Sequence, residues 1–185
     1  MAARAAVRFA SSSSPSPAAT RPLRYAGRTV VVTGGSRGIG EGVTRVFARE
    51  GANVVFCGLP SHAQLGRALV AELAPASAGK LLYVEAAGDI TQASSVDALV
   101  DAAVGGTGRL DCVVNNAASH PHLQAIDEFS VDDLRRLLEL NLVAPFALCR
   151  AAMPHLRKVR GGGRGGGMAG HAQRSLIASY RGASR

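Results

Sequence analysis

The segment Thr33–Gly40 reads Thr-Gly-Gly-Ser-Arg-Gly-Ile-Gly; it follows the apolar run Val30–Val32 and precedes a helical pattern. A chain that turns sharply from a strand into a helix needs glycine where φ is positive and where backbone approaches a ligand. Free N–H groups and the dipole at the helix N-terminus then favour a phosphate. No Gly-Lys-Ser/Thr ends the loop, which disfavours a P-loop. This glycine loop (Thr33–Gly40) therefore predicts a dinucleotide pyrophosphate site, with an ordinary glycine turn as the alternative.

Short apolar strands alternate with helical segments from Arg28 onward, a pattern typical of a parallel sheet with crossover helices. The predicted strands are Thr29–Thr33, Ala52–Cys57, Leu81–Glu85 and Cys112–Asn115. Most of them run into Gly, Asn or other small residues at the carboxyl edge, where doubly wound sheets bind ligands. The sequence therefore predicts an α/β fold with an incomplete, Rossmann-like, doubly wound parallel sheet of about four strands and crossover helices.

Apolar residues at helical spacing predict which helix faces pack on the sheet. They are Ile39, Val43, Val46 and Phe47 after the glycine loop; Leu65, Leu69 and Leu73 in Gln64–Leu73; Val96, Leu99, Val100 and Ala103 in Ser94–Val104; and Leu134, Leu137 and Leu138 in Val131–Met153. We expect all of these side chains to belong to the core.

Positive charge is concentrated at the two ends of the chain. The net charge is +8, but residues 1–40 hold six arginines and residues 157–185 hold seven basic residues, and neither stretch holds an acid. Residues 41–156 are mildly acidic, with thirteen acidic and eight basic residues. A nucleic-acid-binding face on the folded part is therefore not expected.

Cysteine and histidine spacing indicates neither a disulfide framework nor a metal site. Cys57, Cys112 and Cys149 are odd in number and widely spaced, which fits a reducing compartment. His120-Pro121-His122 has no partner ligands nearby in the sequence, so we expect a loop there.

Composition divides the chain into three parts. Residues 1–23 are rich in Ala, Ser and Arg, as mitochondrial transit peptides are, or they form a disordered extension. Residues 24–158 form the predicted dinucleotide-binding domain, and residues 159–185, rich in Gly and Arg, are expected to be disordered. No apolar run reaches the roughly 18 residues of a membrane span. We expect a cytoplasmic protein, with the mitochondrion as the alternative.

The glycine loop, together with Asn115-Asn116-Ala117 after the fourth strand, resembles the short-chain dehydrogenase/reductase family. The segments that resemble in particular its type 14 17β-hydroxysteroid dehydrogenases are Arg24–Gly27, Leu110–Ala117, His120-Pro121 and Leu137–Leu142. The resemblance covers about residues 24–158, and it implies a C-terminally truncated member of the family. It implies a Rossmann-type tetramer that oxidises a secondary alcohol, such as a steroid 17β-hydroxyl, with a nicotinamide cofactor.

The resemblance also assigns cofactor-binding roles. The residues that it implies hold the pyrophosphate and adenosine side are Gly34, Arg37, Gly38, Ile39 and Gly40. It implies that Asp89 bonds the adenine amine, and the alternative is a turn or helix-capping aspartate. It further implies that Asn115 ties strand four to its neighbours, and that Asn116 and Ala117 lie along the cofactor.

Asn141 resembles the family asparagine whose backbone carbonyl holds a water in a proton relay. Pro145 has no N–H and cannot bond the carbonyl four residues back, which leaves that oxygen free. The alternative is a kinked helix without a function.

The type of nicotinamide cofactor stays open. An acid at the end of strand two normally bonds the adenosine ribose and selects NAD, and this place is Gly58. With Arg37 nearby, a 2′-phosphate is not repelled, so NADP is possible, whereas the resemblance alone implies NAD.

The catalytic pair that the family needs is absent from this sequence. Lysine in a Tyr-x-x-x-Lys pair lowers the pKa of tyrosine for general acid or base work. The three tyrosines, Tyr25, Tyr83 and Tyr180, are followed four residues later by Thr29, Ala87 and Ser184. We therefore predict an inactive chain, with a non-enzymatic nucleotide-binding module or a subunit-interaction fragment as the alternative.

Overall fold

The computed structural model describes residues 22–119, 125 and 127–161 of the 185-residue chain. A four-stranded sheet forms its centre, in the order β3-β2-β1-β4. The strands are β1 (Thr29–Val32), β2 (Asn53–Phe56), β3 (Leu81–Tyr83) and β4 (Cys112–Val114). All three strand pairs are parallel, and Val32 pairs with Phe56 on one side and with Val114 on the other. The carboxyl ends of all four strands therefore meet at one edge, as the sequence predicts.

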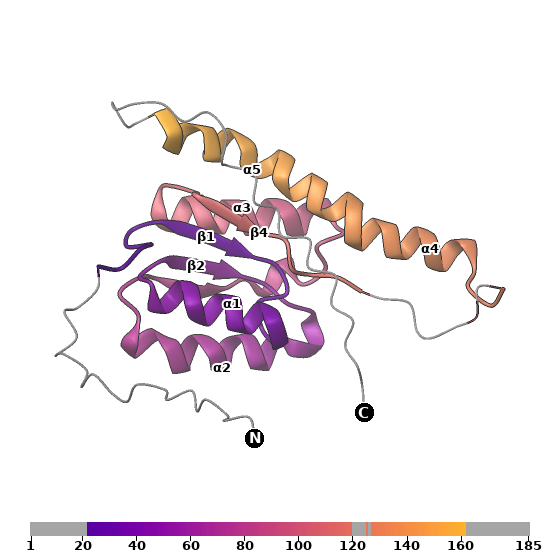
Figure 1. The fold of residues 1–185 in the computed structure, drawn as a ribbon, viewed down its shortest axis with the longest axis horizontal. Helices are drawn as coiled ribbons and strands as arrows, with labels where there is room; N and C mark the ends of the chain where they lie inside the picture. Colours follow the sequence, from indigo (N-terminus) through magenta and orange to yellow (C-terminus); the bar gives the residue numbers. More distant parts are fainter. Residues whose placement is uncertain (1–21, 120–124, 126, 162–185) are drawn as a thin grey trace, which may run out of the picture.

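Helices cover both faces of the sheet (Figure 1). The α-helices are α1 (Gly38–Arg49), α2 (Ala63–Leu73), α3 (Ala93–Thr107), α4 (Val131–Leu138) and α5 (Ala144–Gly161). Short 3₁₀ turns are η1 (Pro60–His62), η2 (Ala74–Ala76) and η3 (Glu85–Ala87), and η4 (Glu139–Val143) is a π-helical turn. Helices α1 and α2 lie on one face, and α3 and α5 lie on the other (Figure 1).

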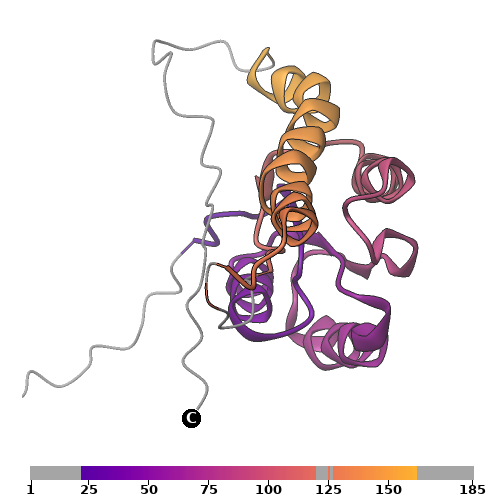
Figure 2. The ribbon, with the colours of Figure 1, turned by 90° about the vertical axis from the view of Figure 1, so that its right-hand side faces the viewer.

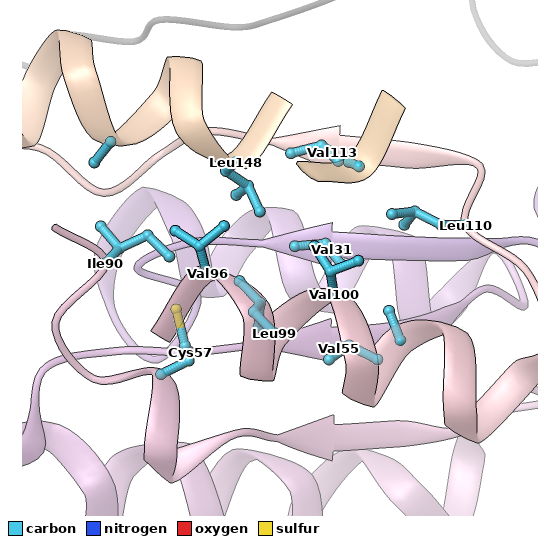
Figure 3. Close-up of a cluster of buried hydrophobic side chains, with 14 residues drawn as sticks. Val31, Val55, Cys57, Ile90, Val96, Leu99, Val100, Leu110, Val113 and Leu148 are labelled. Carbon is cyan, nitrogen blue, oxygen red and sulfur yellow. The ribbon is translucent and has the colours of Figure 1, made fainter. Parts of the chain in front are cut away.

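Two apolar clusters hold the layers together. Val31, Val55 and Val113 point from the sheet toward α3 and α5, where Leu99 and Leu148 complete the first cluster (Figure 3). A second cluster lies between the opposite face of the sheet and the helices α1 and α2; its buried members include Val30, Val32, Val54 and Phe56. Continuous valine runs suit strands buried on both faces, which explains why the sequence located them correctly.

Helix packing confirms some of the predicted core residues and corrects others. Val96, Leu99, Val100 and Ala103 are buried in α3, as predicted. The predictions for Ile39, Val46, Leu65, Leu134 and Leu138 were wrong, since their side chains are 42–53% exposed. Helix α1 instead buries the small residues Gly40, Thr44 and Ala48. Small side chains let a helix approach the sheet closely, which places larger neighbours at the edges of the contact.

The long helix predicted over Val131–Met153 is divided by the π-helical turn η4. The N–H of Ala144 donates to the carbonyl of Glu139, five residues back. Pro145 follows at once, and its missing N–H and its ring disfavour continued α-helical bonding. Helix α5 then continues to Gly161, three residues beyond the predicted end of the domain. The boundaries predicted at residues 23 and 158 otherwise stay predictions, since residues 1–21 and 162–185 lie outside the described residues.

The sequence predicted no membrane span, whereas the described residues contain one helical run, Val131–Val159, that could be one. Its length and composition suffice for crossing a membrane, with a mean hydropathy of 1.3 in its most apolar part. A core helix of a soluble protein has the same length and composition, so these two properties do not define a membrane span here. Leu148 and Ala152 of α5 are buried in the first apolar cluster.

Candidate functional site

The glycine loop connects β1 to α1 at the carboxyl edge of the sheet. Gly34 has φ +64° and Gly38 has φ +56°, a region that side chains disfavour. A Cβ on Gly40 would lie 2.0 Å from the carbonyl oxygen of Gly34 and 2.5 Å from Nδ2 of Asn116. Only glycine therefore allows α1 to start so close to β1.

The N-terminus of α1 is open to a ligand. Arg37 is the N-cap residue, and no side-chain hydrogen bond caps the helix. A Cβ on Gly38 would meet no atom within 4 Å, so space adjoins the first turn. The carboxylate of Glu41, in that turn, is paired with Arg45 at 2.8 Å. Uncapped N–H groups and open space fit a pyrophosphate.

The loop after β4 is bonded directly to the glycine loop. Oγ1 of Thr33 accepts hydrogen bonds from the N–H groups of Asn116 and Ala117, both at 3.0 Å. Nδ2 of Asn116 donates to the carbonyls of Thr33 at 3.0 Å and Gly34 at 3.1 Å. The structure thus brings Asn116 and Ala117 to the predicted pyrophosphate site. Sequence reasoning missed the role of the Thr33 hydroxyl, although Thr33 belongs to the motif.

Asn115, directly after β4, links the end of this strand to a neighbouring helix. Its Nδ2 donates to Sγ of Cys149 in α5 at 3.3 Å, and its side chain is buried. The side chain of Asn116 instead bonds the glycine loop that follows β1. Asn115 points to the opposite side of the chain because successive side chains in extended backbone alternate.

Asn141 lies in η4, and its side chain binds the loop after β4. Its Oδ1 accepts from the N–H of Ser119 at 3.0 Å, and its Nδ2 donates to the carbonyl of Ser119 at 2.8 Å. The sequence did not predict this pair of bonds, because the partners are 22 residues apart and no spacing rule relates them. The role of the Asn141 carbonyl stays a prediction.

Asp89 forms a turn ahead of α3. Its Oδ1 accepts from the N–H of Thr91 at 3.0 Å and from the Thr91 hydroxyl at 2.7 Å. These hydrogen bonds from Thr91 lower the pKa of Asp89. Its contacts match the turn alternative, whereas the N-cap of α3 is Gln92. Its bond to adenine stays a prediction.

The end of β2 is enclosed by two side chains that the sequence did not single out. A Cβ on Gly58 would lie 2.1 Å from Oγ of Ser36, which is buried. On another side, the hydroxyl of Tyr83 donates to the carbonyl of Gly58 at 3.2 Å. Residue 58 is a glycine, so it adds no side chain at the end of β2. Arg37, which follows Ser36 in the sequence, is exposed.

Metal ligation has no candidate in the described part of the chain, where no group of three His, Cys, Asp or Glu residues could hold an ion. The segment His120-Pro121-His122 and Tyr180 lie outside the described residues.

A parallel sheet with a glycine loop at its carboxyl edge defines a dinucleotide-binding protein of the Rossmann type. The family model described as "short chain dehydrogenase" matches residues 28–168. This chain belongs to the short-chain dehydrogenase family, as the sequence predicted.

Known proteins resemble this chain over three quarters of its length. An L-fucose dehydrogenase of Oryctolagus cuniculus is 48% identical over 138 residues, which are 75% of this chain and 45% of that protein. The crystal structure of L-sorbose reductase from Gluconobacter frateurii with NADPH and L-sorbose is 27% identical, with a TM-score of 0.68, and the match covers 75% of this chain and 51% of that one. A metagenomic short-chain oxidoreductase in complex with NADP is 28% identical, with a TM-score of 0.65 and coverages of 74% and 59%. The chain spans about half the length of the curated relatives it matches. These relatives give no specific support to the resemblance to 17β-hydroxysteroid dehydrogenases.

The contact between Gly40 and Gly34 predicts a difference between two glycines of the same helix. Gly40→Ala should lower the free energy of unfolding by about 1–3 kcal/mol, because the methyl group overlaps a backbone carbonyl that cannot turn aside. Gly42 has open space around its Cβ position, so Gly42→Ala should raise stability by about 0.5–1 kcal/mol. Urea denaturation followed by circular dichroism measures both variants. Equal effects of the two substitutions would contradict the close approach.

Proposed function

We propose that this chain binds a nicotinamide dinucleotide at the carboxyl edge of the sheet, as the cofactor-binding half of an oxidoreductase that acts on secondary alcohols. The observation that carries the proposal is the uncapped start of α1, held beside the carbonyl of Gly34 by Gly40. The family match and the NADP-bound structural relatives support it.

The residues of the site have separate tasks in this proposal. The first N–H groups of α1, from Gly38 to Gly40, bind the pyrophosphate, and the loop at Asn116 and Ala117 lies along the nicotinamide ribose. Asp89 accepts a bond from the adenine amine, and the Asn141 carbonyl holds a water. The bound dinucleotide supplies the hydride acceptor for oxidation of a secondary alcohol.

NADP is the cofactor we propose, with NAD as the alternative that the family resemblance favours. Position 58 carries no carboxylate to bond a ribose 2′-hydroxyl or to repel a 2′-phosphate. Arg37 is exposed and directly follows Ser36, whose Oγ packs against Gly58. Arginine is well suited to phosphate recognition.

A monosaccharide hydroxyl is the substrate that we propose for the complete protein. The names of two relatives, an L-fucose dehydrogenase and an L-sorbose reductase, support a sugar. The resemblance in the sequence favours a steroid 17β-hydroxyl as the alternative. For the 185-residue chain itself we propose binding without turnover, because its sequence holds no Tyr-x-x-x-Lys pair.

Titration calorimetry of the full chain with NADPH and NADH tests this function. We expect tighter binding of NADPH, and no turnover of L-fucose or estradiol with either nucleotide. Gly58→Asp should weaken NADPH binding by about tenfold or more relative to NADH, because like charges meet at the 2′-phosphate. A Cβ at position 58 also meets Oγ of Ser36, so Gly58→Asn, which adds the same bulk there without the charge, is the control. The proposal fails if the wild-type chain binds neither nucleotide.

A second candidate function is association between subunits through the helical run α4–η4–α5. Large apolar side chains are exposed along it: Val131, Leu134, Leu138, Leu142, Val143 and Phe146. Both views show this run as one rod, and α4 extends beyond the sheet (Figures 1 and 2). Exposed apolar patches of this kind mark interaction surfaces. The homo-oligomer implied by the family resemblance would bury them.

Sedimentation velocity tests this second function. Phe146 is 68% exposed, and Phe146→Glu should shift the chain toward the monomer by placing a charge in the apolar contact. Leu65→Glu changes a comparably exposed apolar residue on α2 and should leave the sedimentation coefficient unchanged. A wild-type chain that stays monomeric at every concentration would rule out self-association through this helix.

A further inference from the structure

Tyr83, at the end of β3, is held firmly in place by two neighbouring elements. Its ring lies 5.4 Å from the ring of Phe56 in β2, tilted by 51°. It also lies so close to α2 that a Cβ on Gly66 would be 2.5 Å from Cδ2 and Cε2 of the tyrosine. Packing therefore fixes where the hydroxyl lies, independently of the bond that it makes.

The hydroxyl of Tyr83 fixes one peptide group at the end of β2. It donates to the carbonyl of Gly58 at 3.2 Å, while the carbonyl before it, that of Cys57, accepts from the N–H of Gly35 at 2.8 Å. The N–H of a trans peptide points opposite to its carbonyl, so the Tyr83 bond also fixes the direction of the Leu59 N–H. Within the described residues, the Leu59 N–H has no acceptor.

Two further observations concern the hydrogen bond from Tyr83 to Gly58: the protonation of the tyrosine hydroxyl and the packing around the glycine. Burial is the main cause that raises the pKa of Tyr83, so the hydroxyl keeps its proton at neutral pH. The Oγ of Ser36 packs against the α-carbon of Gly58 and limits movement of the backbone there. The direction of the Leu59 N–H is thus fixed at the end of β2, where Gly58 lies against Ser36, the residue before the exposed Arg37.

We infer that Tyr83 is a positioning residue that directs the Leu59 N–H at the 2′ substituent of the adenosine ribose, and that it thereby favours a 2′-phosphate. The inference rests on the proposed dinucleotide site and assigns a specificity role to a residue outside the glycine loop. A hydrogen bond to a charged phosphate is roughly twice as strong as one to a neutral hydroxyl, which gives the preference its direction. Without the tyrosine hydroxyl, the Gly58 carbonyl is free to rotate toward the phosphate and oppose its binding.

Tyr83→Phe tests this inference, because phenylalanine keeps the ring and removes only the hydrogen bond. The ligands are 2′,5′-ADP and 5′-AMP, which differ by the 2′-phosphate, and calorimetry on the full chain gives the ratio of their dissociation constants. We expect the preference for 2′,5′-ADP to fall about five- to tenfold, the size expected for the difference between one hydrogen bond to a charged group and one to a neutral group. Tyr25→Phe is the matched control, since the Tyr25 ring packs on Phe47 and its hydroxyl has no partner among the described residues.

The outcomes separate the inference from the proposed function. A wild-type chain that binds neither nucleotide refutes the dinucleotide site, and this inference fails with it. If the wild-type chain binds both and Tyr83→Phe leaves the ratio unchanged, the dinucleotide site stands and the inference is wrong. An equal loss of affinity for both ligands, with a lowered melting temperature, would show a purely structural role and also overturn the inference.

Discussion

The close approach of α1 to β1 is the constraint on which the rest of the site depends. Gly40 lies against the carbonyl of Gly34, and the side chain of Asn116 donates to that carbonyl from the loop after β4. The start of α1, the loop after β1 and the loop after β4 are therefore in direct contact. This arrangement leaves the first N–H groups of α1 without a capping side chain, at the edge where parallel strands end.

Much of this fold could be predicted from the sequence, because runs such as Val30–Val32 are buried on both faces and leave little choice of structure. The buried faces of the helices were harder to predict. Helical periodicity located α1, but its buried face consists of Gly40, Thr44 and Ala48, whereas periodicity selected Ile39 and Val46. Hydrophobicity identifies large apolar side chains, and it does not show where small residues let two elements approach.

The candidate site was predicted in the same uneven way. The glycine loop carries its own spacing and its neighbours in sequence, so its position at the sheet edge followed directly. The bonds from Asn141 to Ser119 and from Tyr83 to Gly58 join residues 22 and 25 positions apart, and only the folded chain shows them. The sequence alone shows that glycine stands at position 58, in the place of an acid that would select NAD. Only the structure shows that Ser36 packs against this glycine.

The proposed dinucleotide site is tested most directly by amide chemical shifts, recorded on the full chain as NADPH is added. We expect the largest changes at Gly38, Ile39 and Gly40, where the N–H groups of α1 receive the pyrophosphate, with further changes at Asn116 and Ala117. Shifts that stay absent at millimolar NADPH, or that are confined to α4 and α5, would contradict the proposed site.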